Sequence, residues 1–506
     1  MMRRLLSGCL CLWLAAAAAW LPPVSASAPA SPGALTSHLR RALDTLPPGQ
    51  KLSVIVHLTN WAARLSAPGQ AGLVRALRQH ADAAQTPIRA WLRVQEAEGR
   101  VSNVIALWII NGLALTASRE VILELAARPD VATVTVDEAR FAPHAFRPSL
   151  QAQPVNDNLT LIGAPEAWAR GVTGQGIVVA VLDSGVDFSH PDLKTRWRGG
   201  KNSWFDPYGE SPEAPIDLNG HGTQVAGVIL GGDAGGAPIG VAPGAQWIAG
   251  KVFDVRGRAT ASAIHQVLQW VLDPDGDPAT ADAPHVVNSS WATVIGLCND
   301  EFSEDLRALR AAGILPVFAA GVDGQTSPAN TLDAFAVSAL TDAETLSSDS
   351  PSGPSVCADK PVFPQVVAPT GNVHTSDLFS TYVTLDEGGT SMAAAHVSGA
   401  LALLLSAKSG LSTDEQAAVL TETAVDLGEP GPDNMFGYGR INIAAALDRL
   451  LGPDPIAQAT AAASLQPNGN DTNPATLPIV LVGLLTVVIA VGLVVLWRRR
   501  QSSARR

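Results

Sequence analysis

Short apolar runs alternate with amphipathic stretches along the chain from residue 176 onward. Five of these runs read as buried strands, at residues 177–182, 247–253, 285–288, 314–318 and 334–337. Between two of them, apolar residues recur at helical spacing, at Ile264, Val267, Leu268 and Val271. Continuous apolar strands are typical of a parallel sheet that is covered on both faces. The pattern therefore predicts an α/β domain in which helices cover both faces of a mainly parallel sheet.

Residues 29–145 predict a different order of strands and helices. Strands are expected at 51–58, 102–116 and 131–136, and a helix at 119–127. A long helical stretch carries apolar residues at Leu73, Val74, Leu77, Trp91, Leu92 and Val94. Residues 29–50 are rich in Ala, Pro and Ser and read as an exposed start. Together these elements predict a small, separate α+β domain over residues 29–145.

Both ends of the chain carry apolar runs without charge. Residues 1–28 combine a basic start, an apolar run and an Ala-Ser-Ala end, which is typical of a signal peptide. Residues 477–497 would span ~30 Å as a helix, enough to cross a bilayer. The arginines in residues 498–506 place this tail in the cytoplasm and the domains before it outside the cell. Residues 453–476, which have few large apolar side chains, predict a flexible stalk.

Net charge limits the classes of partner that are expected, and cysteine content bears on how the thiols pair. The formal net charge is −12, and no basic cluster precedes the tail, so nucleic acid is not an expected partner. Cys298 and Cys357 are the cysteines that remain once a signal peptide is removed. In an exported protein they can form a disulfide, and the alternative is two separate buried thiols. The sequence leaves both arrangements open.

Three short motifs carry the groups needed for covalent catalysis. Asp183 follows a predicted buried strand, at the end where open α/β sheets place their sites. His221 lies between two glycines at the start of a predicted helix. Ser391 follows a Gly-Thr turn at the start of another helix, whose amides favour a developing anion. Each residue alone is more often structural, but the chain order Asp, His, Ser is that of the subtilisin triad.

These motifs resemble the signatures of subtilisin-like serine proteases. The three segments read VAVLDSGVDFSHPDL, NGHGTQVAG and GTSMAAAHVSG, and VAPGA, QVVAPTGNV and GYGRIN flank them. The resemblance predicts a catalytic domain over residues 146–452. It implies that Asp183 orients the imidazole, that His221 acts as general base and then acid, and that Ser391 attacks the peptide carbonyl. NGLALTA and PDVATVTVDE in the preceding domain are similar to the inhibitory propeptides of the family, which assist folding and are then cleaved off.

The resemblance also implies a substrate cleft. Two segments match those that pair with the substrate backbone by strand addition, namely Ser290, Trp291 and Ala292, and Ala319, Ala320 and Gly321. The family has an asparagine after the second segment, and its amide donates a hydrogen bond to the oxyanion. Val322 stands there in this chain and offers no donor. The chemistry needs no cofactor; structural calcium is common in the family, and the motifs indicate no ligands for it here.

Two functions follow from these observations. The first is a secreted, membrane-anchored serine endopeptidase that acts on proteins or peptides, is made as a zymogen with its own propeptide as inhibitor, and is slowed by Val322. The alternative is a catalytically impaired pseudoprotease that binds peptides in the same cleft. The complete triad favours the enzyme, whereas Val322 favours the alternative.

Overall fold

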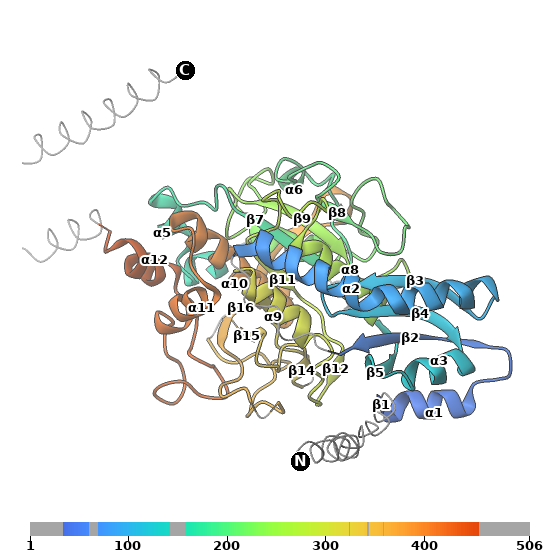
Figure 1. Cartoon of the computed structure of the whole chain (residues 1–506). Helices are drawn as coiled ribbons and strands as arrows, with labels where there is room; N and C mark the ends of the chain where they lie inside the picture. The colour runs from blue at the N-terminus through green and yellow to red at the C-terminus, as the bar shows by residue number, and fades with distance from the viewer. Residues whose placement is uncertain are drawn as a thin grey trace, which may run out of the picture. The chain divides into compact units, whose positions relative to one another are not determined.

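The computed structural model describes residues 34–59, 69–141, 157–322, 324–341, 344–357 and 359–454 (Figure 1). The predicted signal peptide, membrane helix and basic tail, at 1–28 and 477–506, lie outside these residues. Most of the predicted stalk does too.

A seven-stranded sheet forms the centre of the C-terminal part. Its order is β16-β15-β13-β11-β7-β9-β8, and every neighbouring pair is parallel. The strands are β7 (Val178–Asp183), β8 (Trp204–Phe205), β9 (Gln246–Lys251), β11 (Val286–Ser289), β13 (Leu315–Ala319), β15 (Phe335–Leu340) and β16 (Val366–Pro369). The five predicted strands all belong to this sheet, so the predicted fold class is confirmed.

Helices cover both faces of this sheet (Figure 1). Val179 and Val181 of β7 belong to a core that includes α7 (His221–Leu230) and α10 (Gly389–Ala407). Ala180 and Leu182 of β7 belong to a second core, which includes α8 (Ala261–Leu272) and α9 (Ser303–Ala311). Successive side chains of a strand point to opposite faces, which explains the unbroken apolar run of β7. The other helices of this part are α4 (Asp157–Leu161), α5 (Ala164–Ala169), α6 (Pro191–Lys194), η2 (Leu378–Ser380), α11 (Thr413–Glu422) and α12 (Ile443–Leu451).

Three antiparallel strand pairs of the described residues lie outside the large sheet. They are β6 (Ala139–Phe141) with β10 (Arg258–Thr260), β12 (Val294–Ile295) with β14 (Thr326–Ser327), and β17 (Gly371–Asp377) with β18 (Thr381–Glu387). The first of these pairs joins the N-terminal part of the chain to the C-terminal part.

Among the described residues, α10 is the one helix long and apolar enough to cross a membrane. Its most apolar stretch is 89% buried inside the protein, however. Because it packs between the sheet and other helices, α10 is a core helix of the folded domain.

A second sheet of five strands, with three helices, forms the N-terminal domain. Its strand order is β1-β5-β2-β4-β3. The elements are β1 (Ala34–Leu35), α1 (Ser37–Thr45), β2 (Lys51–Leu58), α2 (Gly69–Ala97), β3 (Val101–Leu107), β4 (Gly112–Ser118), α3 (Arg119–Ala126) and β5 (Val131–Val136). The strand region expected at 102–116 is therefore a hairpin of two strands, because the chain reverses at residues 108–111.

Two further expectations for the N-terminal domain differ from the structure. Residues 37–45 form the helix α1 and not an exposed start. The side chain of Thr36 caps this helix, and Leu39 and Leu43 bury one face of it. Val94 of α2 is 54% exposed, because the apolar face of that helix runs through Leu92 and not through Val94.

The N-terminal domain packs on α8 through apolar side chains. Leu73, Val74 and Leu77 of α2 lie in the same buried cluster as Ile264 and Leu268 of α8. The apolar faces of α2 and α8 cover each other here, so neither of these faces is exposed to water. The contact therefore continues the core of the large domain into the small one.

Polar contacts hold the N-terminal domain at both ends of α8. At its start, the Asp137 carboxylate accepts hydrogen bonds from the Ser262 N–H at 3.0 Å and the Ser262 hydroxyl at 2.6 Å. Near its end, Arg78 pairs with Asp273 at 2.6 Å. The Asp137 carboxylate complements the dipole at the start of the helix, whereas Arg78 compensates the unfavourable negative charge of Asp273, the C-cap residue.

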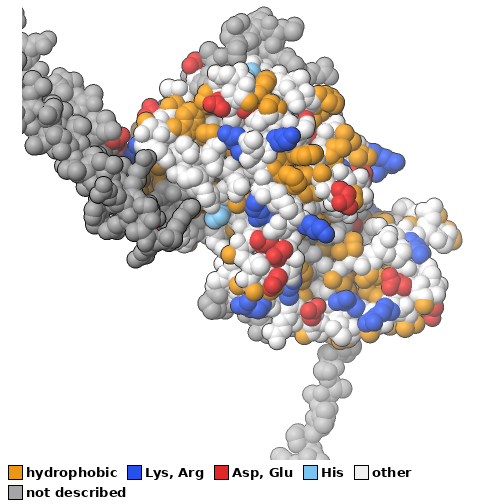
Figure 2. Space-filling view, turned by 90° about the horizontal axis from the view of Figure 1, so that it is seen from above, with side chains coloured by type: hydrophobic (Ala, Val, Ile, Leu, Met, Phe, Trp, Pro, Cys, Tyr) orange, Lys and Arg blue, Asp and Glu red, His pale blue; other side chains and the backbone are white. Residues whose placement is uncertain are grey.

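The face seen in Figure 2 carries basic, acidic and apolar side chains side by side over the described part of the surface. Charges of both signs are interspersed there and are not segregated into regions of one sign. A mixed surface of this kind is typical of a protein face that meets water.

A disulfide joins Cys298, which follows β12, to Cys357 in the loop before β16. The two Cα atoms are 5.0 Å apart, although 59 positions separate the residues in the sequence. Of the two arrangements that the sequence leaves open, the structure has the covalent one.

Replacement of both cysteines by serine should lower the free energy of unfolding by about 2–4 kcal/mol, because the unfolded chain regains the entropy of an open loop. Urea denaturation of the double variant, in a Ser391→Ala background that prevents self-digestion, measures this loss. Reduction of the parent with a thiol is the matched control and should cost the same amount. An unchanged unfolding midpoint would contradict the prediction.

Candidate functional site

The last residue of β7, Asp183, is fully buried and meets the first residue of α7, His221. Its Oδ1 lies 2.8 Å from His221 Nδ1 and also accepts the Ser184 N–H at 2.7 Å. When Nδ1 donates to the carboxylate, the neutral imidazole has its acceptor at Nε2. The pair can therefore take a proton at Nε2 and stabilise the imidazolium that results.

Gly222 allows the start of α7 to come this close to the end of β7. A Cβ atom on Gly222 would lie 2.1 Å from the Gly185 carbonyl oxygen and 3.1 Å from Asp183 Cβ. The first distance is too short for a non-bonded contact, and the second is unusually tight. Gly222, which directly follows His221, is therefore required for the helix to approach the strand this closely.

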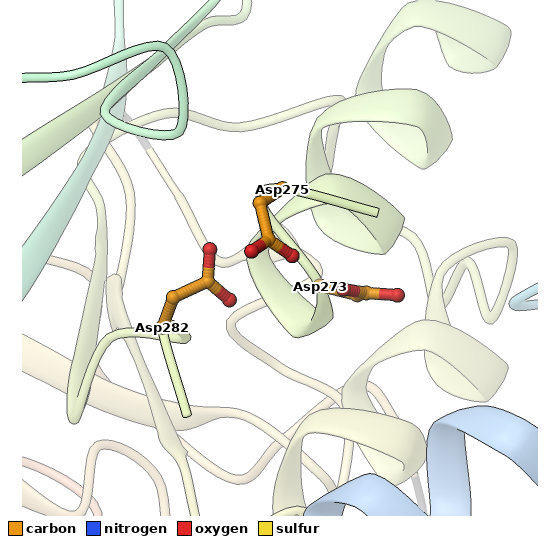
Figure 3. A group of neighbouring side chains, drawn as sticks. All are labelled: Asp273, Asp275 and Asp282. Carbon is orange, nitrogen blue, oxygen red and sulfur yellow. The ribbon is translucent and has the colours of Figure 1, made fainter. Parts of the chain in front are cut away.

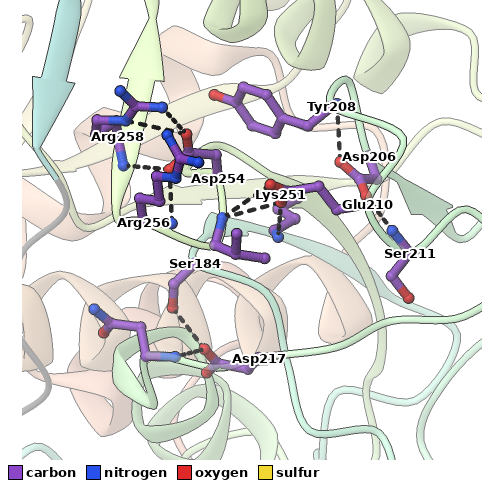
Figure 4. Close-up of polar contacts among 12 residues, drawn as sticks. Ser184, Asp206, Tyr208, Glu210, Ser211, Asp217, Lys251, Asp254, Arg256 and Arg258 are labelled. Atoms are coloured by element: carbon purple, nitrogen blue, oxygen red, sulfur yellow. Dashed lines mark hydrogen bonds and ion pairs between the residues drawn. The ribbon is translucent and has the colours of Figure 1, made fainter.

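Asp217, which the sequence analysis did not single out, organises the turn before α7 (Figure 4). Its Oδ1 accepts the N–H groups of Asn219 and Gly220, both at 2.9 Å, and the Ser184 hydroxyl at 3.0 Å. Its Oδ2 accepts the Thr223 hydroxyl at 2.7 Å. Burial raises the pKa of the Asp217 carboxyl. The available signal was an acidic residue two positions before Asn-Gly, a pattern typical of a side-chain-capped turn.

Ser391 is the third residue of α10, and the start of this helix contacts both predicted cleft segments. Its carbonyl accepts the Ser290 hydroxyl at 3.1 Å, and its own Oγ lies 3.5 Å from the Ser290 carbonyl oxygen. The neighbouring Thr390 hydroxyl donates to the Gly321 carbonyl at 2.8 Å. The serine therefore stands in the first turn of a 19-residue helix, where free amides favour negative charge.

A buried amide connects the first cleft segment to α10. Asn288, in β11, donates to the Ser290 hydroxyl at 3.0 Å and accepts the Ser398 hydroxyl at 2.8 Å. No local sequence pattern indicates the contact with Ser398, since 110 positions separate its ends. It fixes the distance between the strand end and the helix that carries Ser391.

The side chain of Trp291 does not contribute to a cleft. It is buried, and its ring packs edge-on against Phe318 at 5.3 Å between centroids and against Phe302 at 6.2 Å. Only its backbone can meet a substrate, as strand addition requires. Ala292 is half-buried, whereas Ala320 is fully buried.

The N-terminal part adds a strand beside this site. Ala139–Phe141 pairs with Arg258–Thr260 in antiparallel register. Arg258–Thr260 follows β9, and the last residue of β9, Lys251, lies opposite Asp183 in the sheet. The backbone of β6 thus occupies the edge of β10, a strand that begins seven residues after the end of β9.

Ion pairs stiffen the chain that leads from β9 to this edge (Figure 4). Lys251 pairs with Glu210 at 2.7 Å, and Glu210 also accepts the Val255 N–H at 3.0 Å. Asp254 accepts the N–H of Arg258 at 2.9 Å and pairs with its guanidinium at 2.9 Å. The edge strand β10 is therefore held in place before any peptide is added to it.

Asp273, Asp275 and Asp282 are the described residues most able to hold a metal (Figure 3). Their carboxylate oxygens lie within 4.8 Å of one another, and calcium prefers oxygen ligands of this kind. In this structure, however, Arg78 of the N-terminal domain neutralises Asp273 and donates to the Gly276 carbonyl at 2.8 Å. The donor set fits calcium, but a guanidinium takes part of it.

Comparison with known proteins agrees with this geometry. The profile of the Subtilase family matches residues 174–439. Bacillopeptidase F of Bacillus subtilis (strain 168) is 34% identical over 453 residues, which is 82% of this chain, and the chain spans 31% of the length of that protein. Subtilisin BL of Lederbergia lenta is 36% identical over 298 residues, 58% of this chain and 99% of its own length. The chain therefore belongs to the subtilase family of serine endopeptidases.

Proposed function

We propose that this chain cleaves peptide bonds with Asp183, His221 and Ser391. The observation that carries the proposal is the 2.8 Å contact between Asp183 and His221, in a helix that packs against the helix with Ser391 in its first turn. His221 removes the proton of the Ser391 hydroxyl as this attacks the carbonyl, and then delivers it to the leaving amine. Asp183 holds the ring and stabilises its charged form.

We further propose that the N-terminal domain, residues 29–145, is the inhibitory propeptide of a zymogen. The antiparallel pairing of β6 with β10 supports this, because a peptide that adds a strand there blocks the same edge for substrates. Contacts at both ends of α8, through Asp137 and Arg78, hold the domain in place. Cleavage near residue 145 then leaves residues 146–452 as the catalytic domain.

We also propose that the enzyme is exported and stays at the cell membrane, with the catalytic domain outside and residues 498–506 inside. This rests on the apolar runs in residues 1–28 and 477–497 and on the arginines that follow. Protein or peptide substrates outside the cell are the partners that this location implies.

Val322 bears on the rate of the proposed reaction. Its side chain is 44% exposed beside Gly321, whose carbonyl bonds to Thr390, so it stands close to the proposed nucleophile without any donor. Loss of one oxyanion donor in a subtilisin lowers kcat by about 10²–10³-fold. The same observation favours the second candidate function, a pseudoprotease that binds peptides in the cleft without turnover.

Ser391→Ala should accumulate at the mass of the proform, because the proposed self-cleavage needs the hydroxyl. Intact-mass spectrometry of purified protein measures this. Ser406→Ala, a change in the same helix, is the matched control and should lose the N-terminal domain as the parent does. Normal processing of Ser391→Ala would refute the assigned nucleophile or show that another protease makes the cut.

Val322→Asn should raise kcat on a peptide substrate by at least about tenfold with little change in KM, because the new hydrogen bond forms mainly in the transition state. Steady-state kinetics of the processed enzyme checks this, and Val322→Ala, which adds no donor, should stay at the parent rate. Equal rates for all three would mean that another group already serves the oxyanion. Absence of turnover in all three supports the pseudoprotease.

Cells that express the full chain should yield the protein in the membrane fraction, and protease added to intact cells should remove the catalytic domain. Immunoblotting against that domain and against a tag after residue 506 measures both. Deletion of residues 477–506 is the control and should release the protein into the medium. A parent protein found wholly in the medium, with no anchored precursor, contradicts the proposed topology.

A further inference from the structure

Three hydrogen bonds in series connect the middle of α10 to its first turn by way of β11. The Ser398 hydroxyl donates to the Asn288 side-chain oxygen at 2.8 Å, and the Asn288 amide nitrogen donates to the Ser290 hydroxyl at 3.0 Å. The Ser290 hydroxyl donates to the Ser391 carbonyl at 3.1 Å. We name these three bonds the hydrogen-bond chain. All four residues are buried, so bulk water does not compete for these bonds.

Asn288 fixes the direction in which the hydrogen-bond chain runs. Its amide oxygen takes the Ser398 proton, so its NH2 group, which can only donate, faces Ser290. A serine hydroxyl has one proton to give. Because the Ser290 oxygen already accepts a proton from Asn288, its own proton is left for the Ser391 carbonyl.

Separate contacts hold the two residues before Ser391 in α10. The Thr390 hydroxyl donates to the Gly321 carbonyl at 2.8 Å, and the Thr370 hydroxyl donates to the Gly389 carbonyl at 3.1 Å. The Ser391 Oγ lies 3.5 Å from the Ser290 carbonyl oxygen, which is long for a hydrogen bond. The shorter bond between these two serines, from the Ser290 hydroxyl to the Ser391 carbonyl, is therefore the one that fixes Ser391 relative to the first cleft segment.

We propose that Asn288 is a positioning residue for peptide-bond cleavage, because it directs the Ser290 proton to the Ser391 carbonyl and so fixes the nucleophile relative to the segment that receives the substrate. This inference rests on the proposed function of Ser391. A substrate that pairs with residues 290–292 has its carbonyl placed by that segment. An error of about 1 Å between such a carbonyl and the attacking oxygen costs on the order of 10²-fold in rate.

Asn288→Asp tests the direction of the hydrogen-bond chain with almost no change of shape. An ionised carboxylate cannot donate, and it draws the Ser290 proton away from the Ser391 carbonyl. We expect kcat on a peptide substrate to fall about tenfold or more while KM stays within about twofold, because the backbone that binds the substrate is unchanged. A trace of affinity-tagged parent enzyme, removed before the kinetics, processes each variant.

The pH dependence of this variant gives a second signature. A buried carboxyl has a raised pKa, and its protonated form donates to Ser290 as the amide does. The ratio of the kcat of Asn288→Asp to that of the parent should therefore approach one as the pH falls. A ratio that moves further from one at low pH contradicts the inference.

Ser290→Ala removes the bond that Asn288 is proposed to direct and should cost kcat a similar factor. Asn288→Asp should then have no further effect in the Ser290→Ala background, whereas two independent losses of packing would multiply. Asn442→Asp is the matched control, since Asn442 caps α12 by accepting the Ala445 N–H at 3.1 Å and a carboxylate keeps that contact. It should retain the kcat of the parent.

The inference is overturned if Ser290→Ala keeps the kcat of the parent, a result that decides the matter even when Asn288→Asp does not fold. It is also overturned if the losses of the two single variants multiply in the double variant. Labelling of Ser391 by a fluorophosphonate, read by mass spectrometry, separates these results from failure of the proposed function. A parent that neither takes the label nor cleaves the peptide overturns the proposed function, and the inference with it.

Discussion

The packing of α7 against α10 on one face of the parallel sheet is the contact on which the proposed site depends. Both helices lie in a single buried cluster with β7, and small residues along α10 let the backbones approach. At Gly399, a Cβ atom would lie 2.6 Å from Val241 Cβ and 2.9 Å from the Ile229 carbonyl oxygen. Because His221 and Ser391 are at or near the N-terminal ends of these two helices, the helix packing sets where their side chains stand.

The opposite face of the sheet carries α8, which contacts the N-terminal domain. There α8 receives the N-terminal domain, which buries apolar side chains along the helix and places Asp137 and Arg78 at its two ends. None of these contacts depends on the chain between residues 141 and 157. A cut in that connection alone would therefore leave the N-terminal domain bound until its noncovalent contacts are lost.

Val322 ends the segment 319–322, and Lys360 supports the turn that follows this segment. The backbone around Val322 is well supported, since Gly321 bonds to Thr390, Ala320 bonds to Thr326, and the turn beyond is held by Lys360. The exposed Val322 therefore follows a well-supported backbone, and its own side chain offers no hydrogen-bond donor.

The sequence was sufficient for the architecture, and it named the candidates for the reacting groups. Unbroken apolar runs predicted the parallel sheet, because strands covered on both faces have no polar side to mark them. The motifs around Asp183, His221 and Ser391 predicted a triad, because each is a local pattern in which a reactive residue lies beside its own turn or helix start. The helix α1 was missed where Ala, Pro and Ser dominate and only Leu39 and Leu43 mark a buried face.

Only the tertiary structure decided which distant residues meet. The disulfide between Cys298 and Cys357, the pair of Arg78 with Asp273, and the contacts of Lys360 with three carbonyls all join segments that are separate in the sequence. Asp217 also accepts the Ser184 hydroxyl, 33 positions away, and the turn pattern around Asn219 does not display that contact. Local periodicity reports what a segment buries, but the partner against which it is buried depends on how the whole chain closes, and the sequence of one segment does not contain that information.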